Sequence, residues 1–230
     1  MVNIDDVYQK VLVLANKEQR GYITPQEFNL FANQAQKEIF EQYFYDLNQF
    51  SRIHGDSGEY SDAVHNINEK IAIFERSGGF TNGSFNGSGI DLYRLGTVIY
   101  NHSTLGNIEV EEVQQNEILY INASPLTKPT LNKPVYIRTG NTSISVFPSS
   151  INTVSCTYVQ APVIPQWGYF VVGNKALYDA SNATNFNLHQ SEESELVYKI
   201  LKLAGITMKS SEVVQVGQTL EQSQVQQEKQ

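Results

Sequence analysis

The spacing of apolar residues changes twice along this chain, and this change limits the possible folds more than any single motif does. Apolar residues recur every three or four positions up to residue 77, as on one face of a helix. Between residues 90 and 172 short β-favouring runs broken by prolines replace them, and helical spacing returns at residue 191. Short helices at both chain ends need a shared core to bury their apolar faces. The sequence therefore predicts one helical core interrupted by a β module.

The best-marked element is a long helix that begins after Ile23. Thr24 suits its N-cap, Pro25 suits the first helical position, and Glu27 can return the hydrogen bond of a capping box. Ile23 and Phe28 lie where a hydrophobic staple would pack. The apolar face then continues for about six turns through Phe28, Phe31, Ala32, Ala35, Ile39, Tyr43 and Leu47.

The predicted fold class is α+β: a helical bundle from both chain ends with an inserted all-β module of sandwich or barrel type. Residues 1–77 form the N-terminal part of the helical domain, and residues 78–190 form the β module with its connecting loops. Residues 191–230 supply the C-terminal helices, which complete the helical domain, and a partly flexible tail. The stretch from Ser77 to Gly89 is rich in Gly, Ser and Asn, and we expect a flexible connection or an exposed loop there.

Composition argues against several kinds of function. The net charge of −8 disfavours a phosphate-binding surface, so direct binding of DNA is not expected. Cys156 is the single cysteine, which rules out an internal disulfide framework and predicts a small buried residue in a strand. Residues 1–17 lack a basic start followed by an apolar run, and no run of about 20 apolar residues could span a bilayer. We expect synthesis in the cytoplasm and no membrane contact.

No group of residues has the pattern of a catalytic, cofactor or metal site. The histidines are scattered and none has a second histidine at metal-ligand spacing: His54, His65, His102 and His189. Two acidic clusters could be offered as paired catalytic carboxylates: Glu109/Glu111/Glu112 and Glu192/Glu193/Glu195. Strand alternation explains the first cluster, and the positive end of a helix dipole explains the second. We therefore predict no catalytic residue, no cofactor and no metal.

Surplus aromatic residues indicate contact surfaces instead. Tyr43, Phe44 and Tyr45 are consecutive and cannot all face one core, so either a subunit interface lies there or the helix is covered on two sides within one chain. Trp167 lies with Tyr169 in an extended, aromatic segment. It either docks into a neighbouring subunit or clamps the insert onto the helices.

The C-terminal tail is the third candidate contact. Its sparse apolar positions, Val213, Val216 and Leu220, would supply a short apolar face in a polar and Gln-rich sequence. We expect the tail to order only against a partner.

Three segments carry a resemblance to a known group of proteins. They are Asn16–Asn29, then Pro162-x-x-Pro165-x-Trp167-Gly168-Tyr169, and then Asn185–Glu193 leading into Glu195-Leu196-Val197. In this order they resemble virion structural proteins of tailed bacteriophages, including those of crAss-like, short-tailed phages, which are placed at the head–tail junction or neck.

The resemblance implies a function in the virion. It implies an adaptor-like helical core with a β insertion, assembled as a homo-oligomeric ring, commonly twelvefold, beneath the portal. Such a ring continues the DNA channel and is a platform for tail proteins, so the implied partners are the portal protein and other neck or tail proteins. Ring symmetry requires that one face of each subunit meets a different face of the next. The matching segments imply no catalytic residue.

Two other functions stay open at the level of sequence. One is a tail-associated cell-wall hydrolase, for which Glu109, Glu111 and Glu112 are the only carboxylate candidates. The other is a binding module in which the β insert recognises a host glycan or a tail fibre. An exposed aromatic row would favour the binding module, and the candidates for it are Tyr93, Tyr100, Tyr120 and Tyr136.

Overall fold

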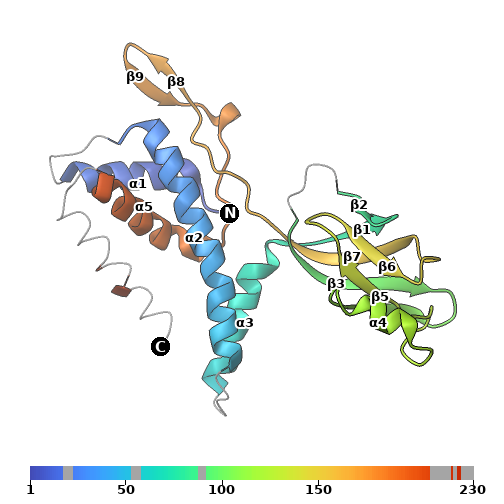
Figure 1. The fold of residues 1–230 in the computed structure, drawn as a ribbon. Coiled ribbons are helices and arrows are strands. Elements are labelled where there is room, and N and C mark those ends of the chain that lie inside the picture. Colours follow the sequence, from blue (N-terminus) through green and yellow to red (C-terminus); the bar gives the residue numbers. More distant parts are fainter. Residues whose placement is uncertain (18–22, 53–57, 88–91, 208–218, 220–221, 224–230) are drawn as a thin grey trace. The chain divides into compact units, whose positions relative to one another are not determined.

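The structure is a computed structural model that describes residues 1–17, 23–52, 58–87, 92–207, 219 and 222–223. The fold is α+β, and the chain divides into two compact units (Figure 1). The first unit contains Met1–Ile73 and Pro162–Gln230, and the second contains Phe74–Ala161. Both ends of the chain therefore contribute to one unit, and the middle of the chain forms the other.

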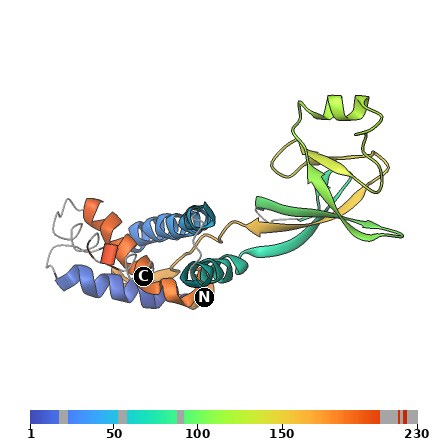
Figure 2. The same ribbon diagram turned by 90° about the horizontal axis from the view of Figure 1, so that it is seen from below.

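Helices dominate the first unit. Their bounds are Ile4–Lys17 for α1, Pro25–Arg52 for α2, Gly58–Ala72 for α3 and Glu193–Thr207 for α5. Strands β8 (Tyr169–Val172) and β9 (Lys175–Tyr178) form a hairpin, and η1 (Ala180–Asn182) and η2 (Gln190–Glu192) are short 3₁₀ helices. α2 contacts both α3 and α5, and Figure 2 shows α2 and α3 side by side. Among the helices that the structure describes, none is long and apolar enough to cross a membrane.

The start of α2 confirms the predicted capping box. The Glu27 backbone N–H donates to Thr24 Oγ1 at 3.3 Å, and the Thr24 backbone N–H donates to Glu27 Oε2 at 3.0 Å. Hydrogen bonding from Thr24 holds the pKa of the Glu27 carboxyl below its usual value. Ile23 and Phe28 are both buried, as a staple requires. The predicted apolar face is correct for Phe28 and Ile39, whereas Phe31 and Leu47 are only partly buried.

The chain returns from the second unit along α2 in an extended form, held by one buried amide. Gln36 is fully buried; its Nε2 donates to the Val163 carbonyl at 2.7 Å, and its Oε1 accepts from the Asn187 N–H at 3.0 Å. The Phe186 N–H donates to the Val2 carbonyl at 3.2 Å. These contacts place residues 162–190 with the helices, so the second unit ends at Ala161 and not at residue 190 as the sequence suggested.

A seven-stranded mixed sheet forms the second unit. The strands are β1 (Glu75–Thr81), β2 (Ser84–Phe85), β3 (Leu92–His102), β4 (Gly106–Glu112), β5 (Val135–Arg138), β6 (Ile144–Phe147) and β7 (Thr153–Gln160), and α4 (Ile118–Ala123) lies between β4 and β5. Their order is β2-β1-β7-β3-β4-β5-β6. The β4–β5 pair is parallel, and the other pairs are antiparallel.

The two edges of this sheet meet, so the unit is a nearly closed barrel. Ser84 of β2 forms an isolated bridge with Ser143, just before β6. The Phe85 N–H donates to the Thr142 carbonyl at 3.0 Å, and the Ile144 N–H donates to the Gly83 carbonyl at 2.8 Å. Closure removes the unpaired edges that would otherwise invite association. Of the two predicted forms of the insert, the structure has the barrel-like one.

The expected flexible connection from Ser77 to Gly89 is largely wrong, because most of it is strand. Ser77–Thr81 belongs to β1 and pairs with β7 in continuous register. A Cβ on Gly79 would lie 2.9 Å from the Val154 carbonyl oxygen, so glycine permits the close pairing. Asn82 and Gly83 have φ of 52° and 82° and make the two-residue turn to β2. The glycines and asparagines here serve a tight hairpin.

Candidate interaction surface

Trp167 is the anchor from which the most distinctive surface of the first unit is built. Its side chain is 2% exposed, and its ring centroid lies 4.4 Å from that of Tyr8 on α1. The indole Nε1–H donates to Asp5 Oδ1 at 2.9 Å, and the backbone N–H donates to Asn29 Oδ1 at 2.7 Å. Asn29 Nδ2 donates in turn to the Trp167 carbonyl at 3.3 Å. Trp167 is therefore fixed against both α1 and α2.

This position corrects the docking hypothesis for Trp167. A ring buried against Tyr8 has no surface to offer to a neighbouring subunit. Trp167 does act as a clamp, but it clamps the returning segment onto the helices of its own unit. Residues 162–190, which include Trp167, belong to the same unit as the helices, so the Trp167 ring packs within that unit.

The base of the β8–β9 hairpin is packed on the anchor. The Tyr169 ring stacks on Trp167 at 5.8 Å with an interplanar angle of 21°, and the Tyr178 ring lies at the same distance. Below them the Asp179 N–H donates to the Gly168 carbonyl at 2.8 Å. A Cβ on Gly168 would meet the Asp179 carbonyl oxygen at 2.7 Å, so only glycine fits at this crossing. The hairpin consequently leaves the helices at a fixed point, and Tyr169 belongs to its base.

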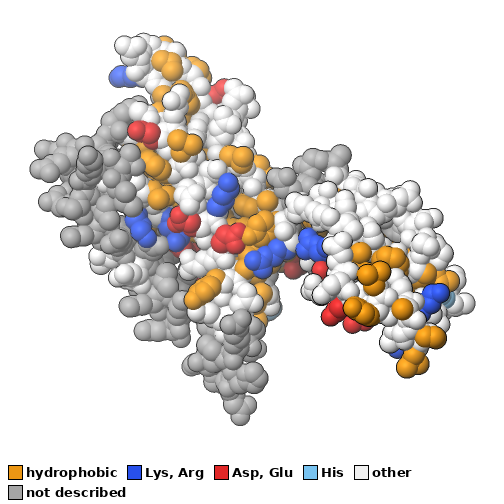
Figure 3. Space-filling model, viewed as in Figure 1, with side chains coloured by type: hydrophobic (Ala, Val, Ile, Leu, Met, Phe, Trp, Pro, Cys, Tyr) orange, Lys and Arg blue, Asp and Glu red, His pale blue; other side chains and the backbone are white. Residues whose placement is uncertain are grey.

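The far part of the hairpin is apolar and exposed. Phe170 pairs with Leu177 and Val172 pairs with Lys175, so these side chains share one face of the two-stranded sheet. Phe170, Val172 and Leu177 are 49%, 56% and 46% exposed. Figure 3 shows hydrophobic side chains on this hairpin, at the top of the view. We call the exposed face made by Phe170, Val172 and Leu177 the hairpin face.

The sequence contains a signal for this hairpin that our sequence analysis missed. The β-favouring run Tyr169–Val172 precedes the pair Gly173-Asn174, and the run Lys175–Tyr178, which ends in Leu-Tyr, follows it. Both of these turn residues have positive φ, 54° and 64°, as a two-residue type I′ turn requires. Gly-Asn between such runs is a recognisable hairpin pattern.

The three consecutive aromatic residues of α2 separate into a buried pair and an exposed residue. Tyr43 and Phe44 are buried, whereas Tyr45 is 61% exposed. Phe44 packs edge-on against Phe40 at 5.1 Å, and the Lys70 ammonium of α3 lies 5.8 Å from the Tyr43 ring centroid. Because α2 also contacts both α3 and α5, it is covered on two sides within one chain, which was one of the two sequence hypotheses. Tyr45 alone of the three can contribute to a subunit contact.

Each carboxylate of the acidic cluster at the start of α5 has a lysine of its own. Glu192 is fully buried and its Oε1 lies 2.6 Å from Lys70 Nζ. Glu193 pairs with Lys10 of α1. Glu195 lies 3.3 Å from Lys199 one turn further along the same helix. The Glu193–Lys10 pair connects α5 to α1, and the Glu192–Lys70 pair connects η2 to α3, so both contribute to the packing of the first unit.

The second acidic cluster is divided between the two faces of β4. Glu109 and Glu111 are exposed on one face, and Glu112 shares the other with the buried Val110. The Tyr136 hydroxyl donates to Glu112 Oε2 at 3.0 Å, and burial together with this bond raises the pKa of Tyr136 well above its usual value. Strand alternation, predicted from the sequence, therefore describes this cluster. Within the described residues no group of three or more His, Cys, Asp or Glu is placed to hold a metal ion.

The four tyrosines considered for glycan binding do not form an exposed row. Tyr136 is buried in the barrel core, Tyr93 and Tyr100 are partly buried, and Tyr120 is exposed on α4. The remaining predicted contact residues, Val213, Val216 and Leu220, lie outside the described residues. Comparison of the sequence with protein-family models and with curated proteins finds no match.

Proposed function

We propose that this chain is a structural subunit of a tailed-phage virion, one of about twelve copies in a homo-oligomeric ring at the portal–tail junction. In this proposal the helical unit is the adaptor-like core of the ring, which continues the DNA channel and carries tail proteins. The protein is made in the host cytoplasm and works in the virion, and its neighbours are the portal protein and other neck or tail proteins. The observation that carries the proposal is the hairpin face.

A rigidly held apolar projection is suited to subunit contact. A two-stranded hairpin is marginally stable by itself in water, and a contiguous exposed apolar face normally marks an interaction site. Here Trp167 fixes the base through Tyr169 and Tyr178, while Phe170, Val172 and Leu177 remain open. The base thus reduces the ordering cost of association, and the hairpin face supplies the apolar area.

The shape of this contact favours a ring. A projecting hairpin meets a different surface on its neighbour, which is the heterologous kind of interface from which closed rings are built. The chain's net charge of −8 is also compatible with a channel that DNA passes without binding.

The segments that resemble phage neck proteins come together in the first unit. Asn29, at the end of the first segment, is hydrogen-bonded to Trp167 in the second. Asn185, at the start of the third segment, accepts a hydrogen bond from the Ile4 N–H at 3.1 Å. The residues behind the resemblance are thus those that assemble the helical unit and its hairpin, which supports a shared scaffold.

The test is the oligomeric state of the purified full-length chain. Light scattering after size-exclusion chromatography should give a discrete oligomer, and electron-microscopy class averages should show rings. Phe170→Asp/Leu177→Asp should reduce the assembly to monomers, because it places two charges on the hairpin face. Leu119→Asp/Leu126→Asp is the matched control, since it adds two charges at exposed leucines of the second unit and should still form rings.

Two results would overturn the proposal. One is a chain that stays monomeric at all concentrations, alone and with portal protein; the other is a ring that the hairpin variant leaves intact. An unchanged emission spectrum of Trp167 in the hairpin variant shows that the base is still folded. Location is tested by antibody labelling of phage particles, which should mark the neck.

A further inference from the structure

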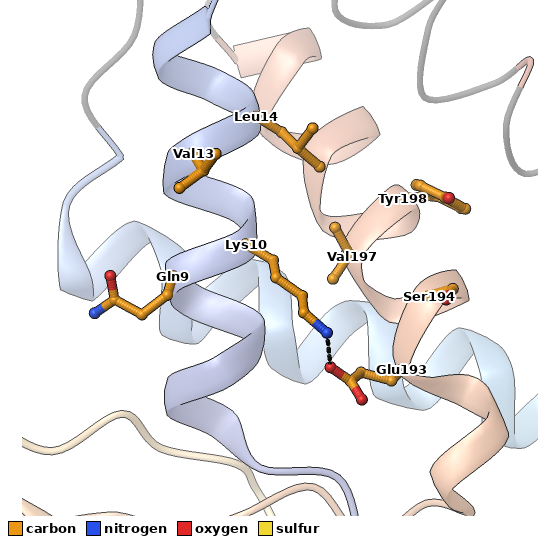
Figure 4. A pocket seen from close by; sticks show the side chains of 8 residues that line it. All are labelled: Gln9, Lys10, Val13, Leu14, Glu193, Ser194, Val197 and Tyr198. Carbon is orange, nitrogen blue, oxygen red and sulfur yellow. Dashed lines mark hydrogen bonds and ion pairs between the residues drawn. The ribbon is translucent and has the colours of Figure 1, made fainter.

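A groove between α1 and α5 is another apolar surface of the first unit. It has a volume of about 390 Å³ and is lined by Gln9, Lys10, Val13, Leu14, Glu193, Ser194, Val197 and Tyr198. Figure 4 shows Lys10 and Glu193 paired at one end, with Leu14 and Val197 on facing sides further along. Val13 is 58% exposed. Because its charged groups pair with each other, the groove presents mainly apolar surface to an occupant.

α1 and α5 form the two walls of the groove, and the two helices run in the same direction along it. Lys10 of α1 lies opposite Glu193 of α5, and Leu14, one turn later, lies beside Val197, also one turn later. α5 ends at Thr207, about 15 Å beyond Val197 at 1.5 Å per residue. Residues 208–230 follow directly. A helix from Ser211 to Gln224 would be about 20 Å long, enough to return from the end of α5 past Val197.

The described residues of this C-terminal segment indicate which side would face the groove. Thr219, Gln222 and Ser223 are helical and exposed, and at 3.6 residues per turn they share one face. In a helix continued through residues 211–224, Val213 and Leu220 would lie more than about 100° around the helix axis from the centre of that face, with Gly217 between them in the sequence. A seam with apolar residues at both ends and a glycine in the middle suits close packing into a groove between two helices.

We propose that the groove between α1 and α5 is the binding site for the chain's own C-terminal segment, which docks there as a helix through Val213, Gly217 and Leu220. Attachment at Thr207 favours the same chain over a second copy, because a short connection gives the segment a local concentration in the millimolar range. The inference does not depend on ring assembly. It assigns the segment a binding site within its own subunit, whereas the sequence analysis expected a partner.

Disulfide cross-linking in the full-length chain tests the contact directly. Under mild oxidation Val13→Cys/Leu220→Cys should form an intrachain disulfide at a yield independent of protein concentration. Val13→Cys/Thr219→Cys is the control, because Thr219 lies on the opposite face, and its yield should be at least about fivefold lower. Cys156 gives little background, since it is buried and burial raises the pKa of its thiol to about 11.

A second measurement covers the energetics of docking. Val213→Asp/Leu220→Asp should lower the melting temperature of the first unit, followed by Trp167 fluorescence, by about 3–6 °C. Thr219→Asp/Ser223→Asp, which adds the same charges to the exposed face, should leave it within about 1 °C. Equal yields for both cysteine pairs, no disulfide, or disulfides only between chains would overturn the proposal. The last of these outcomes would mean that the segment binds the groove of a neighbouring copy.

Discussion

Replacing Trp167 by phenylalanine should weaken the first unit by an amount that its contacts define. Phenylalanine keeps an aromatic ring against Tyr8 but loses the Nε1–H that donates to Asp5 Oδ1 at 2.9 Å. A hydrogen bond to a charged acceptor contributes about 1.5–3 kcal/mol. The smaller ring also leaves unfilled space beside Tyr8, which adds about 1 kcal/mol. We therefore expect the free energy of unfolding to fall by about 2.5–4 kcal/mol.

A double-mutant cycle with Asp5→Ala isolates the hydrogen bond. Asp5 also lies in the first turn of α1, where a carboxylate stabilises the helix by about 0.3–1 kcal/mol. This contribution is lost in Asp5→Ala whether or not Trp167 is present, so it cancels in the cycle. Urea titrations monitored by circular dichroism should give a coupling energy of about 1.5–3 kcal/mol between the two residues. A coupling energy below about 0.3 kcal/mol would refute the clamp.

The same anchor should control the hairpin, and proteolysis can measure this. Lys175 is exposed next to the turn, where trypsin can cleave. Trp167→Ala removes the ring on which Tyr169 and Tyr178 pack, so cleavage at Lys175 should accelerate at least about tenfold relative to the native protein. Leu30→Ala, at an exposed position of α2, should leave the rate unchanged. Equal rates for Trp167→Ala and the native protein would show that the hairpin does not depend on the anchor.

Three further predictions concern the rest of the chain. Ile39→Ala should lower the free energy of unfolding by about 2–5 kcal/mol and Phe28→Ala by about 3–5 kcal/mol, because both side chains are buried. Phe31 is only partly buried, so Phe31→Ala should cost less. Equal losses for the two phenylalanine variants in urea titrations would contradict the assigned faces of α2. Cys156 should resist a thiol reagent at about pH 8 until denaturant is added, because burial raises its pKa to about 11; rapid labelling of the folded protein would show that the barrel core is open. Replacing Glu109, Glu111 and Glu112 by glutamine should leave folding and oligomeric state unchanged, and a cell-wall zymogram with clearing that vanishes on Glu111→Gln would favour the hydrolase instead.

Local signals in the sequence were sufficient for the elements whose cause is local. Thr24 and Glu27 define the start of α2 because a capping box involves residues three positions apart. Strand alternation likewise accounts for Glu109, Glu111 and Glu112 on β4. The insertion of a β module between helices could be predicted from the change in apolar spacing. The closure of its sheet through Ser84 and Ser143 could not be predicted, because that contact joins positions 59 residues apart in the sequence.

The prediction was wrong where composition was taken for flexibility. A run of Gly, Ser and Asn is common both in linkers and in strands that approach another backbone closely, and sequence alone does not separate the two. In this chain Gly79 lies against the Val154 carbonyl, and Asn82-Gly83 makes a tight turn. The β8–β9 hairpin was missed for a different reason, because Gly173-Asn174 was not considered as a turn. Both turns have two consecutive residues with positive φ, which is the physical requirement that such pairs satisfy.

The position of residues 162–190 could not follow from apolar spacing, because an extended segment without regular partners has no period. Its placement depends on single polar side chains that bind its backbone: Gln36 holds Val163 and Asn187, and Asn29 holds Trp167. A buried amide that lies beside Ala35 and Ile39 is costly unless both its donor and its acceptor are used. A glutamine within an otherwise apolar helical face is therefore itself evidence that a non-helical segment crosses the helix there. By this reasoning Gln36→Leu should release the returning segment and with it the hairpin, even though it increases the apolar character of α2.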